Sequence, residues 1–263
     1  MAAARVGDKQ RVLITGATGA IGAALARAHA GRGCHLILQG RDRVALEALA
    51  DYCEECGATA AIHALELDDV AAARAWMVDQ VARAVPDRVI FSAGMNTHIG
   101  ADGAGEDWEA VQSLLRINLA SVMAMVDPLA QAMRAQGCGQ LVFIGSLAGD
   151  YGLALTPAYS ASKAGLRAYS EALSGWLRPA GVRINLVTPG YVHSPMSRAM
   201  PGPHPSQWHA GPAAARIVRG MDRDQAVIRF PFWLALGTRL LRMLPAGLSR
   251  RILHGLGYGP PRH

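Results

Sequence analysis

The chain has 263 residues, of which 51% are hydrophobic and 17% are charged, and it contains 29 glycines. This composition excludes a disordered or fibrous protein and is typical of a globular fold with a large core and tight turns. The formal net charge is +6, and residues 216–263 hold nine arginines against two aspartates, but neither a zinc-finger spacing nor a basic motif with interleaved aromatic residues indicates nucleic-acid binding.

The N-terminal sequence and the apolar stretches predict where the protein acts. Residues 1–10, MAAARVGDKQ, are polar and lack the pattern of a secretion signal, in which a charged segment precedes an apolar one. The apolar stretches are shorter than a membrane span. We therefore expect a cytoplasmic protein. The nine histidines form no metal-ligand pattern, so no metal site is predicted.

Short apolar or β-branched runs alternate along the chain with amphipathic segments rich in alanine and leucine. This alternation is typical of repeated strand–helix–strand units, and it predicts an α/β fold with a parallel sheet. The predicted strands are 11–15, 34–39, 60–66, 88–92, 140–146, 182–187 and 226–230. The predicted helices lie near 20–32, 43–56, 69–84, 106–136, 159–178 and 211–223. Seven strands fit one open sheet, so we expect a single domain over residues 1–263.

Two segments near the C-terminus differ from this pattern. Residues 191–211 are rich in proline, histidine and serine and lack periodicity, which predicts a long mobile loop that serves as a substrate loop or lid. Residues 231–258 are predicted to be an amphipathic helical extension, because an apolar stripe runs beside arginines. The stripe consists of Trp233, Leu234, Leu236, Leu240, Leu241 and Leu244. One interpretation is that this stripe packs against the core or against a second subunit. The other is that it contacts a membrane surface, in which case the substrate would be lipid-linked.

A glycine-rich turn follows the first predicted strand. The sequence TGATGAIG places Gly16, Gly19 and Gly22 between that strand and the next helix. Glycines there allow the backbone to approach a pyrophosphate closely, and the free N–H groups and dipole of the helix attract its charge. The alternative is a turn that only packs the helix on the strand.

The end of the second predicted strand indicates which dinucleotide is bound. A cofactor with a free ribose diol is normally met there by an acidic side chain, but this chain has Gln39, Gly40 and Arg41. Gly40 leaves space, and the Arg41 guanidinium offers donors to a 2′-phosphate. NADP(H) is therefore preferred over NAD(H), unless Arg41 is only a surface residue.

Tyr159 and Lys163 lie four residues apart in YSASK at the start of a predicted helix, so both side chains project from one face. A tyrosine ordinarily titrates near 10, and a nearby cation lowers its pKa. The spacing predicts an acid–base tyrosine that Lys163 makes more acidic. Because such pairs also occur by chance, the surrounding motifs decide.

Six motifs in this order give the chain a family resemblance: TGATGAIG, FSAG (91–94), RIN (116–118), IGS (144–146), YSASK (159–163) and TPGYVHS (188–194). The chain resembles the short-chain dehydrogenase/reductase family over about residues 10–195. The resemblance implies a Rossmann-type, doubly wound parallel sheet, followed here by a C-terminal helical tail. It implies a homodimer or homotetramer paired through helices 106–136 and 159–178, and hydride transfer between the nicotinamide and a small carbonyl or alcohol substrate.

The resemblance also implies site residues. The implied catalytic residues are Asn118, Ser146, Tyr159 and Lys163. Ser146 would hydrogen-bond the substrate carbonyl, Tyr159 would exchange its proton, and Asn118 would hold a water chain to Lys163. The implied cofactor residues are Gly16, Thr18, Gly19, Ile21, Gly22, Arg41, Glu66, Leu67, Ser92, Ala93, Gly94, Tyr159, Lys163, Pro189, Gly190, Val192 and Ser194.

Two departures from the family pattern leave alternatives open. Ala20 replaces the usual middle glycine, and the resulting spacing is closer to the extended branch of sugar-nucleotide epimerases and dehydratases, although few residues follow Gly190 to build their substrate domain. Glu66 and Leu67 replace an Asp-Val pair that contacts adenine, which makes a Glu66 contact uncertain. A third interpretation is a non-catalytic, dinucleotide-binding partner protein at a membrane.

Several residues are candidates to face a substrate. They are Met95, Asn96, Thr97, His98, Leu147, Tyr151, Tyr191, His193, Met196 and Trp208. Their mixture of apolar and polar groups fits many carbonyl compounds, so the sequence does not identify one.

Overall fold

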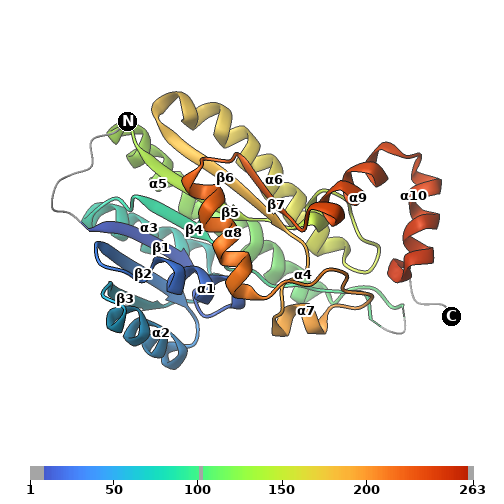
Figure 1. Ribbon diagram of the computed structural model, residues 1–263, viewed down its shortest axis with the longest axis horizontal. Coiled ribbons are helices and arrows are strands. Elements are labelled where there is room, and N and C mark those ends of the chain that lie inside the picture. The colour runs from blue at the N-terminus through green and yellow to red at the C-terminus, as the bar shows by residue number, and fades with distance from the viewer. Residues whose placement is uncertain (1–8, 101–102, 260–263) are drawn as a thin grey trace.

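A computed structural model describes residues 9–100 and 103–259 of the protein. Most of the N-terminal segment on which the secretion-signal argument rests, residues 1–8, lies outside the described residues. Within them, seven parallel strands form one sheet in the order β3-β2-β1-β4-β5-β6-β7 (Figure 1). The strands are β1 (Gln10–Thr15), β2 (Cys34–Gly40), β3 (Thr59–Ala64), β4 (Arg88–Phe91), β5 (Gly139–Ile144), β6 (Val182–Pro189) and β7 (Val227–Phe230). The Rossmann-type fold is confirmed, and each strand begins and ends within two residues of its predicted bounds.

Helices cover both faces of the sheet. They are α1 (Ala20–His29), α2 (Arg43–Glu55), α3 (Val70–Arg83), α4 (Trp108–Leu115), α5 (Ser121–Gln136), α6 (Pro157–Leu177), α7 (Pro195–Ala199), α8 (Ala210–Asp222), α9 (Phe232–Met243) and α10 (Ala246–Leu253). One apolar cluster joins α1, α2 and α8 to the sheet, and a second joins α3, α5 and α6 to it. Strand residues such as Leu13 and Ile14 are therefore fully buried, as expected for a parallel sheet that is covered on both sides.

The predicted helix 106–136 is interrupted. Between α4 and α5 lies a five-residue π-helical turn, η1 (Arg116–Ala120), which contains Asn118. A π turn accommodates an extra residue in the helix, and apolar periodicity does not reveal such a local change. The turn is relevant to the site, because Asn118 is one of the four implied catalytic residues.

The segment 191–211 is more ordered than its sequence predicts. It contains the short helix α7, which begins with a capping box in which Ser194 and Ser197 bond reciprocally. A backbone bridge then pairs Val192 with Trp208. The expectation of a loop without regular structure is wrong at α7, because a serine cap followed by Pro195 favours a helix start despite the many prolines around it.

The C-terminal extension forms α9 and α10, and a second π-helical turn, η4 (His254–Tyr258), follows them. In Figure 1 both helices lie at one end of the molecule, beyond the last strand of the sheet. Three hydrogen bonds fix this extension to the body of the protein, one of them from Arg242 Nη1 to the Asp150 carbonyl at 3.4 Å. Tyr151 Oη donates to Ser249 Oγ at 2.7 Å, and Tyr258 Oη donates to the Pro203 carbonyl at 2.7 Å.

One helical stretch of the described residues, Trp108–Gln136, is long and apolar enough to cross a membrane by length and composition. The sequence had led us to expect only apolar stretches shorter than a membrane span. Val126 and Leu129 of this stretch lie in the core cluster beneath the sheet, and such a packed helix meets the same criteria.

Candidate active site

A cavity of about 760 Å³ opens at the carboxyl ends of the central strands. It lies where the strand order reverses between β1 and β4, the place where open α/β sheets bind their ligands. Thr15 at the end of β1 fixes this point, because its hydroxyl accepts bonds from the amides of Ser92 at 3.2 Å and Ala93 at 3.3 Å. The two strand ends are thereby joined beneath the cavity.

The glycine-rich turn forms one wall of the cavity. Gly16 has a φ of 62°, and a Cβ atom on it would lie 2.6 Å from the Ala93 Cα. Gly22 packs α1 against the turn, since a Cβ atom there would lie 2.2 Å from the Gly16 carbonyl oxygen. Gly19 caps α1 without a side-chain hydrogen bond. The first N–H groups of α1 are thus left for an anion, and the residues fit the pyrophosphate of a dinucleotide.

Gln39 positions the turn relative to β2 and β3. Its side chain accepts a bond from the Gly16 amide at 3.0 Å and donates to the Leu65 carbonyl at 2.7 Å. The next side chain with polar groups, Arg41, is exposed and lines the cavity. Leu67 also lines the cavity, whereas Glu66 is exposed outside it. The structure therefore does not bring the predicted adenine contact of Glu66 to the site.

Ser146, Tyr159 and Lys163 line the same cavity. Tyr159 and Lys163 lie in the first two turns of α6, and Ser146 begins the short 3₁₀ turn after β5. That turn packs directly on α6 at Gly149. A Cβ atom on this residue would lie 2.7 Å from the Lys163 carbonyl group, so only a glycine permits the contact. The Ser146 hydroxyl is close enough to Tyr159 to lower the pKa of its phenol. No sequence motif indicated this role of Gly149.

Lys163 is almost fully buried, and its Nζ donates to the Ile144 carbonyl at 2.9 Å. This bond fixes the ammonium 5.6 Å from the centre of the Tyr159 ring. An ammonium has three donors, so two more can be directed into the cavity. Gly94 borders this group, because a Cβ atom there would lie 3.5 Å from Nζ.

Burial controls the protonation of the pair. It raises the pKa of Tyr159, while the hydrogen bond with Ser146 lowers that pKa by less. Burial also lowers the pKa of Lys163 to about 8. The expectation that Lys163 lowers the tyrosine pKa is therefore wrong in this structure, because burial raises that pKa and Ser146, not Lys163, is the group that lowers it.

Asn118 lies beside the cavity and is not part of its lining. Its amide exchanges two hydrogen bonds with the Met95 backbone, at 2.8 and 2.9 Å, and donates to Ser162 Oγ at 3.1 Å. Ser162 in turn donates to the Tyr159 carbonyl at 2.8 Å. Asn118 thus connects the segment after β4 to the first turn of α6.

Comparisons with known proteins identify the family. The family model described as short chain dehydrogenase matches residues 10–202. The chain belongs to the short-chain dehydrogenase family. An uncharacterized oxidoreductase of Myxococcus xanthus is 33% identical over 89% of this chain and 92% of its own length.

Two solved structures agree with this assignment. A short-chain dehydrogenase of Sphingobium yanoikuyae in complex with NADPH has a TM-score of 0.78 and 28% identity, over 90% of this chain and 94% of that one. A bulky-bulky ketone specific alcohol dehydrogenase of Comamonas testosteroni has a TM-score of 0.76 and 25% identity, over 92% and 94%. The protein is thus an oxidoreductase of a family that binds a nicotinamide dinucleotide and acts on small molecules.

Most residues that the sequence implied for this short-chain dehydrogenase lie around this cavity. Those that line it are Gly16, Thr18, Gly19, Ile21, Arg41, Leu67, Ser92, Ala93, Gly94, Ser146, Tyr159, Lys163, Pro189, Gly190, Val192 and Ser194. Gly22, Glu66 and Asn118 do not. Within residues 9–100 and 103–259, no group of three or more His, Cys, Asp or Glu side chains could hold a metal ion.

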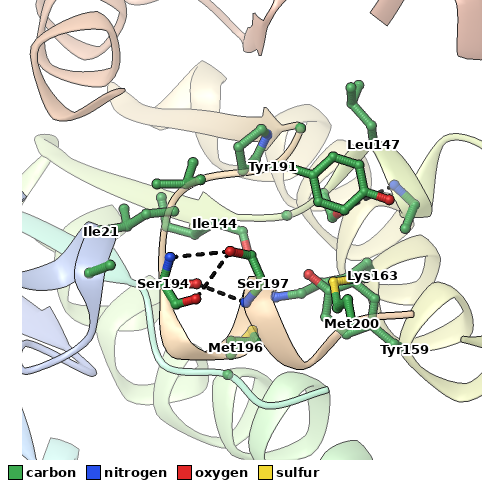
Figure 2. Close-up of a pocket in the computed structure, with 18 of the residues that line it drawn as sticks. Ile21, Ile144, Leu147, Tyr159, Lys163, Tyr191, Ser194, Met196, Ser197 and Met200 are labelled. Atoms are coloured by element: carbon green, nitrogen blue, oxygen red, sulfur yellow. Dashed lines mark hydrogen bonds between the residues drawn. The ribbon is translucent and has the colours of Figure 1, made fainter. Parts of the chain in front are cut away.

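The segment after β6 closes the cavity from a second side. Figure 2 shows Ser194 and Ser197 joined by the dashed hydrogen bonds at the start of α7, with Tyr159 and Lys163 to their right. Of the candidate substrate residues, five line the cavity: Met95, Leu147, Tyr151, Tyr191 and Met196. Asn96, Thr97, His98, His193 and Trp208 do not.

The C-terminal extension supplies a wall that the sequence analysis did not assign. Its residues in the lining are Trp233, Leu234, Gly237, Thr238, Leu241, Leu253, Leu256 and Tyr258. The apolar stripe of residues 231–258 predicted burial, but it could not say that the buried face covers a cavity. In this short-chain dehydrogenase the tail is part of the site.

Proposed function

We propose that this short-chain dehydrogenase is an NADPH-dependent reductase of bulky, apolar ketones, with Tyr159 as the proton donor. The observation that carries the proposal is the placement of Ser146, Tyr159 and Lys163 in one cavity with the glycine-rich turn. A binding protein without activity would not need this set of hydroxyls and ammonium. The sugar-nucleotide alternative is disfavoured, because the described residues after Gly190 add one strand to the same sheet.

The side chains divide the chemistry between them. When bound, the nicotinamide cofactor supplies the hydride that reduces the carbonyl carbon. Ser146 hydrogen-bonds the carbonyl oxygen and holds it near the Tyr159 hydroxyl, which donates its proton to that oxygen. The raised pKa of Tyr159 keeps the phenol protonated at neutral pH, as a proton donor requires. Lys163, fixed by the Ile144 carbonyl, would hold the cofactor ribose with its other donors.

The preference for NADP(H) rests on the end of β2. No carboxylate stands at positions 39–41, and the Arg41 guanidinium borders the cavity. A carboxylate would repel a 2′-phosphate, whereas a guanidinium donates to it. The relative from Sphingobium yanoikuyae, whose structure holds NADPH, supports the same choice.

The substrate class follows from the lining. Met95, Leu147, Leu153, Leu234 and Leu241 contribute apolar groups on several sides of the cavity. Such walls favour a ketone with apolar substituents and offer few partners to a sugar. The ketone specificity of the Comamonas testosteroni relative supports this assignment.

The test is the Tyr159→Phe variant, assayed with NADPH and a panel of ketones whose substituents range from methyl to aryl. The variant keeps the ring but loses the proton, so turnover is expected to fall by at least about 100-fold while NADPH affinity stays the same. Tyr169→Phe is the matched control, because Tyr169 lies on the same helix and packs on Phe143. Normal turnover in Tyr159→Phe would refute the assigned role.

We also propose a cytoplasmic homodimer or homotetramer that is paired through α4, α5 and α6. Large apolar side chains on these helices are exposed, among them Trp108, Leu115, Met123 and Trp176. Burying them in a subunit contact would remove this apolar surface from water. Light scattering on the purified protein measures the mass in solution, and a monomer at micromolar concentration would contradict the proposal.

A further inference from the structure

The helix α9 has two apolar faces. One face lines the cavity through Leu234 and Leu241. The other is exposed, and its residues are Phe232 (67% exposed), Trp233 (77%), Leu236 (38%), Leu240 (53%) and Met243 (82%). Trp233 belongs to both faces, because it also lines the cavity. At about 100° per residue these five side chains fall within an arc of roughly 100° on one side of the helix. The protein therefore presents an apolar stripe to solvent, and Trp233 connects this stripe to the cavity.

The next helix extends this surface. Leu248 and Ile252 of α10 are 47% and 37% exposed, and Leu256 after it is 57% exposed. Leu248 and Ile252 are four residues apart, so they lie on one side of the helix. The same helix is anchored through Ser249, roughly 60–100° around from these two side chains, because Ser249 is buried and bonded to Tyr151. Leu248 and Ile252 are therefore exposed although α10 is bound to the rest of the protein.

The charges of this segment are of one sign. Arg239, Arg242, Arg250 and Arg251 are all exposed on α9 and α10. The sequence contains no aspartate or glutamate after Asp224. Apolar side chains between arginines, with no acidic residue among them, match the surface of an anionic lipid bilayer, where the apolar groups enter the interface and the guanidinium groups reach the phosphates.

We propose that α9 and α10 form a docking surface for an anionic membrane. A second copy of the chain is a poorer occupant, because a twofold contact through this face would bring two arginine-rich surfaces together. Docking would bring the exposed Trp233, which also lines the cavity, to the bilayer, and a ketone dissolved in lipid would reach the cavity past this side chain. That last consequence rests on the proposed function, whereas the docking itself does not.

The experiment measures binding of the full-length protein to vesicles by flotation. One set of vesicles is phosphatidylcholine alone, and in the other about a third of the lipid is phosphatidylglycerol. We expect binding at least about tenfold stronger to the anionic vesicles, and a loss of most of that binding in high salt, because salt screens the attraction.

Two variants separate the two contributions. Phe232→Ser/Leu240→Ser/Met243→Ser removes three outward apolar side chains and is expected to weaken vesicle binding at least about tenfold. Arg239→Gln/Arg251→Gln keeps the apolar stripe and is expected to remove the preference for anionic vesicles. Val44→Ser/Val78→Ser is the matched control, because these valines are exposed on α2 and α3. It should bind vesicles like the wild type.

Thermal unfolding and NADPH affinity of each variant show whether it is folded. Equal flotation of the wild type and the triple serine variant would overturn the proposal, as would equal binding to both kinds of vesicle. An oligomer that the triple serine variant dissociates, with no vesicle binding by the wild type, would assign the surface to a second copy instead. If vesicles bind as expected but no ketone is reduced, the docking surface stands and the proposed function fails.

Discussion

Replacing Gly16 by alanine tests the glycine-rich turn as a cofactor cradle. A residue with a side chain at a φ of 62° costs about 1–2 kcal/mol. The new Cβ atom would also lie 2.6 Å from the Ala93 Cα and 2.8 Å from its nitrogen, so the backbone after β4 must move. That movement strains the two hydrogen bonds to Thr15, each worth about 1 kcal/mol. The total is roughly 2–4 kcal/mol.

Calorimetry would show this loss as a melting temperature lower by roughly 5–10 °C. Titration with NADPH should show an affinity weaker by at least about tenfold, because the turn no longer presents its N–H groups correctly. Gly31→Ala is the control: a Cβ atom there meets nothing within 4 Å, so it should leave both quantities unchanged. If Gly16→Ala melts and binds NADPH like Gly31→Ala, the reasoning about the turn is refuted.

Three further predictions follow from the site. Arg41→Ala should raise the KM for NADPH about 10–100-fold and leave the KM for NADH unchanged. The control Arg43→Ala removes only an exposed ion pair with Glu47 and should change neither KM. Steady-state kinetics with both cofactors measure these values. Burial lowers the pKa of Lys163 from 10.5 to about 8, so between these two pH values the unfolded chain binds more protons than the folded one. The free energy of unfolding of the wild type, relative to that of Lys163→Met, should therefore rise by roughly 3 kcal/mol as the pH increases through this range. Denaturant unfolding at several pH values measures that difference, and a flat profile would contradict it. Ser249→Ala removes the bond to Tyr151 and should raise the KM for a bulky ketone about threefold without affecting NADPH; equal KM values would show that the bond does not hold the wall of the cavity.

The sheet could be predicted because parallel strands that are buried on both faces produce short apolar runs, which the sequence displays directly. The strand Thr59–Ala64 ends two residues before its predicted end, and this difference matters for the site. Glu66 was predicted as a cofactor contact from a motif position, but the turn after the strand leaves it exposed while Leu67 enters the cavity. A motif fixes the order of residues, and the backbone path decides which of them face inward.

The central part of the site was predictable for a different reason. Tyr159 and Lys163 lie on one helix, so their spacing fixes their relative placement. Ser146 and Gly149 come from another element, and only the close contact of the 3₁₀ turn with α6 brings them to the tyrosine. Their approach depends on packing between segments distant in the sequence, which a local pattern does not contain.

The protonation of the pair and the wall formed by the tail could not be predicted for the same reason. The pKa of Tyr159 depends on how much water the folded chain excludes, and the sequence carries no measure of that. The apolar stripe on α9 similarly indicates a helix with a buried side, yet this helix has two apolar sides with different surroundings. A periodicity cannot separate a face against a cavity from a face against water.

The position of α9 directly after β7 has a consequence for biosynthesis. The strands through β6, together with Tyr159 and Lys163, leave the ribosome before residues 232–258 are made. Until then the nascent chain lacks the final wall of the cavity, so the apolar side chains that line it are open to water and to a chaperone.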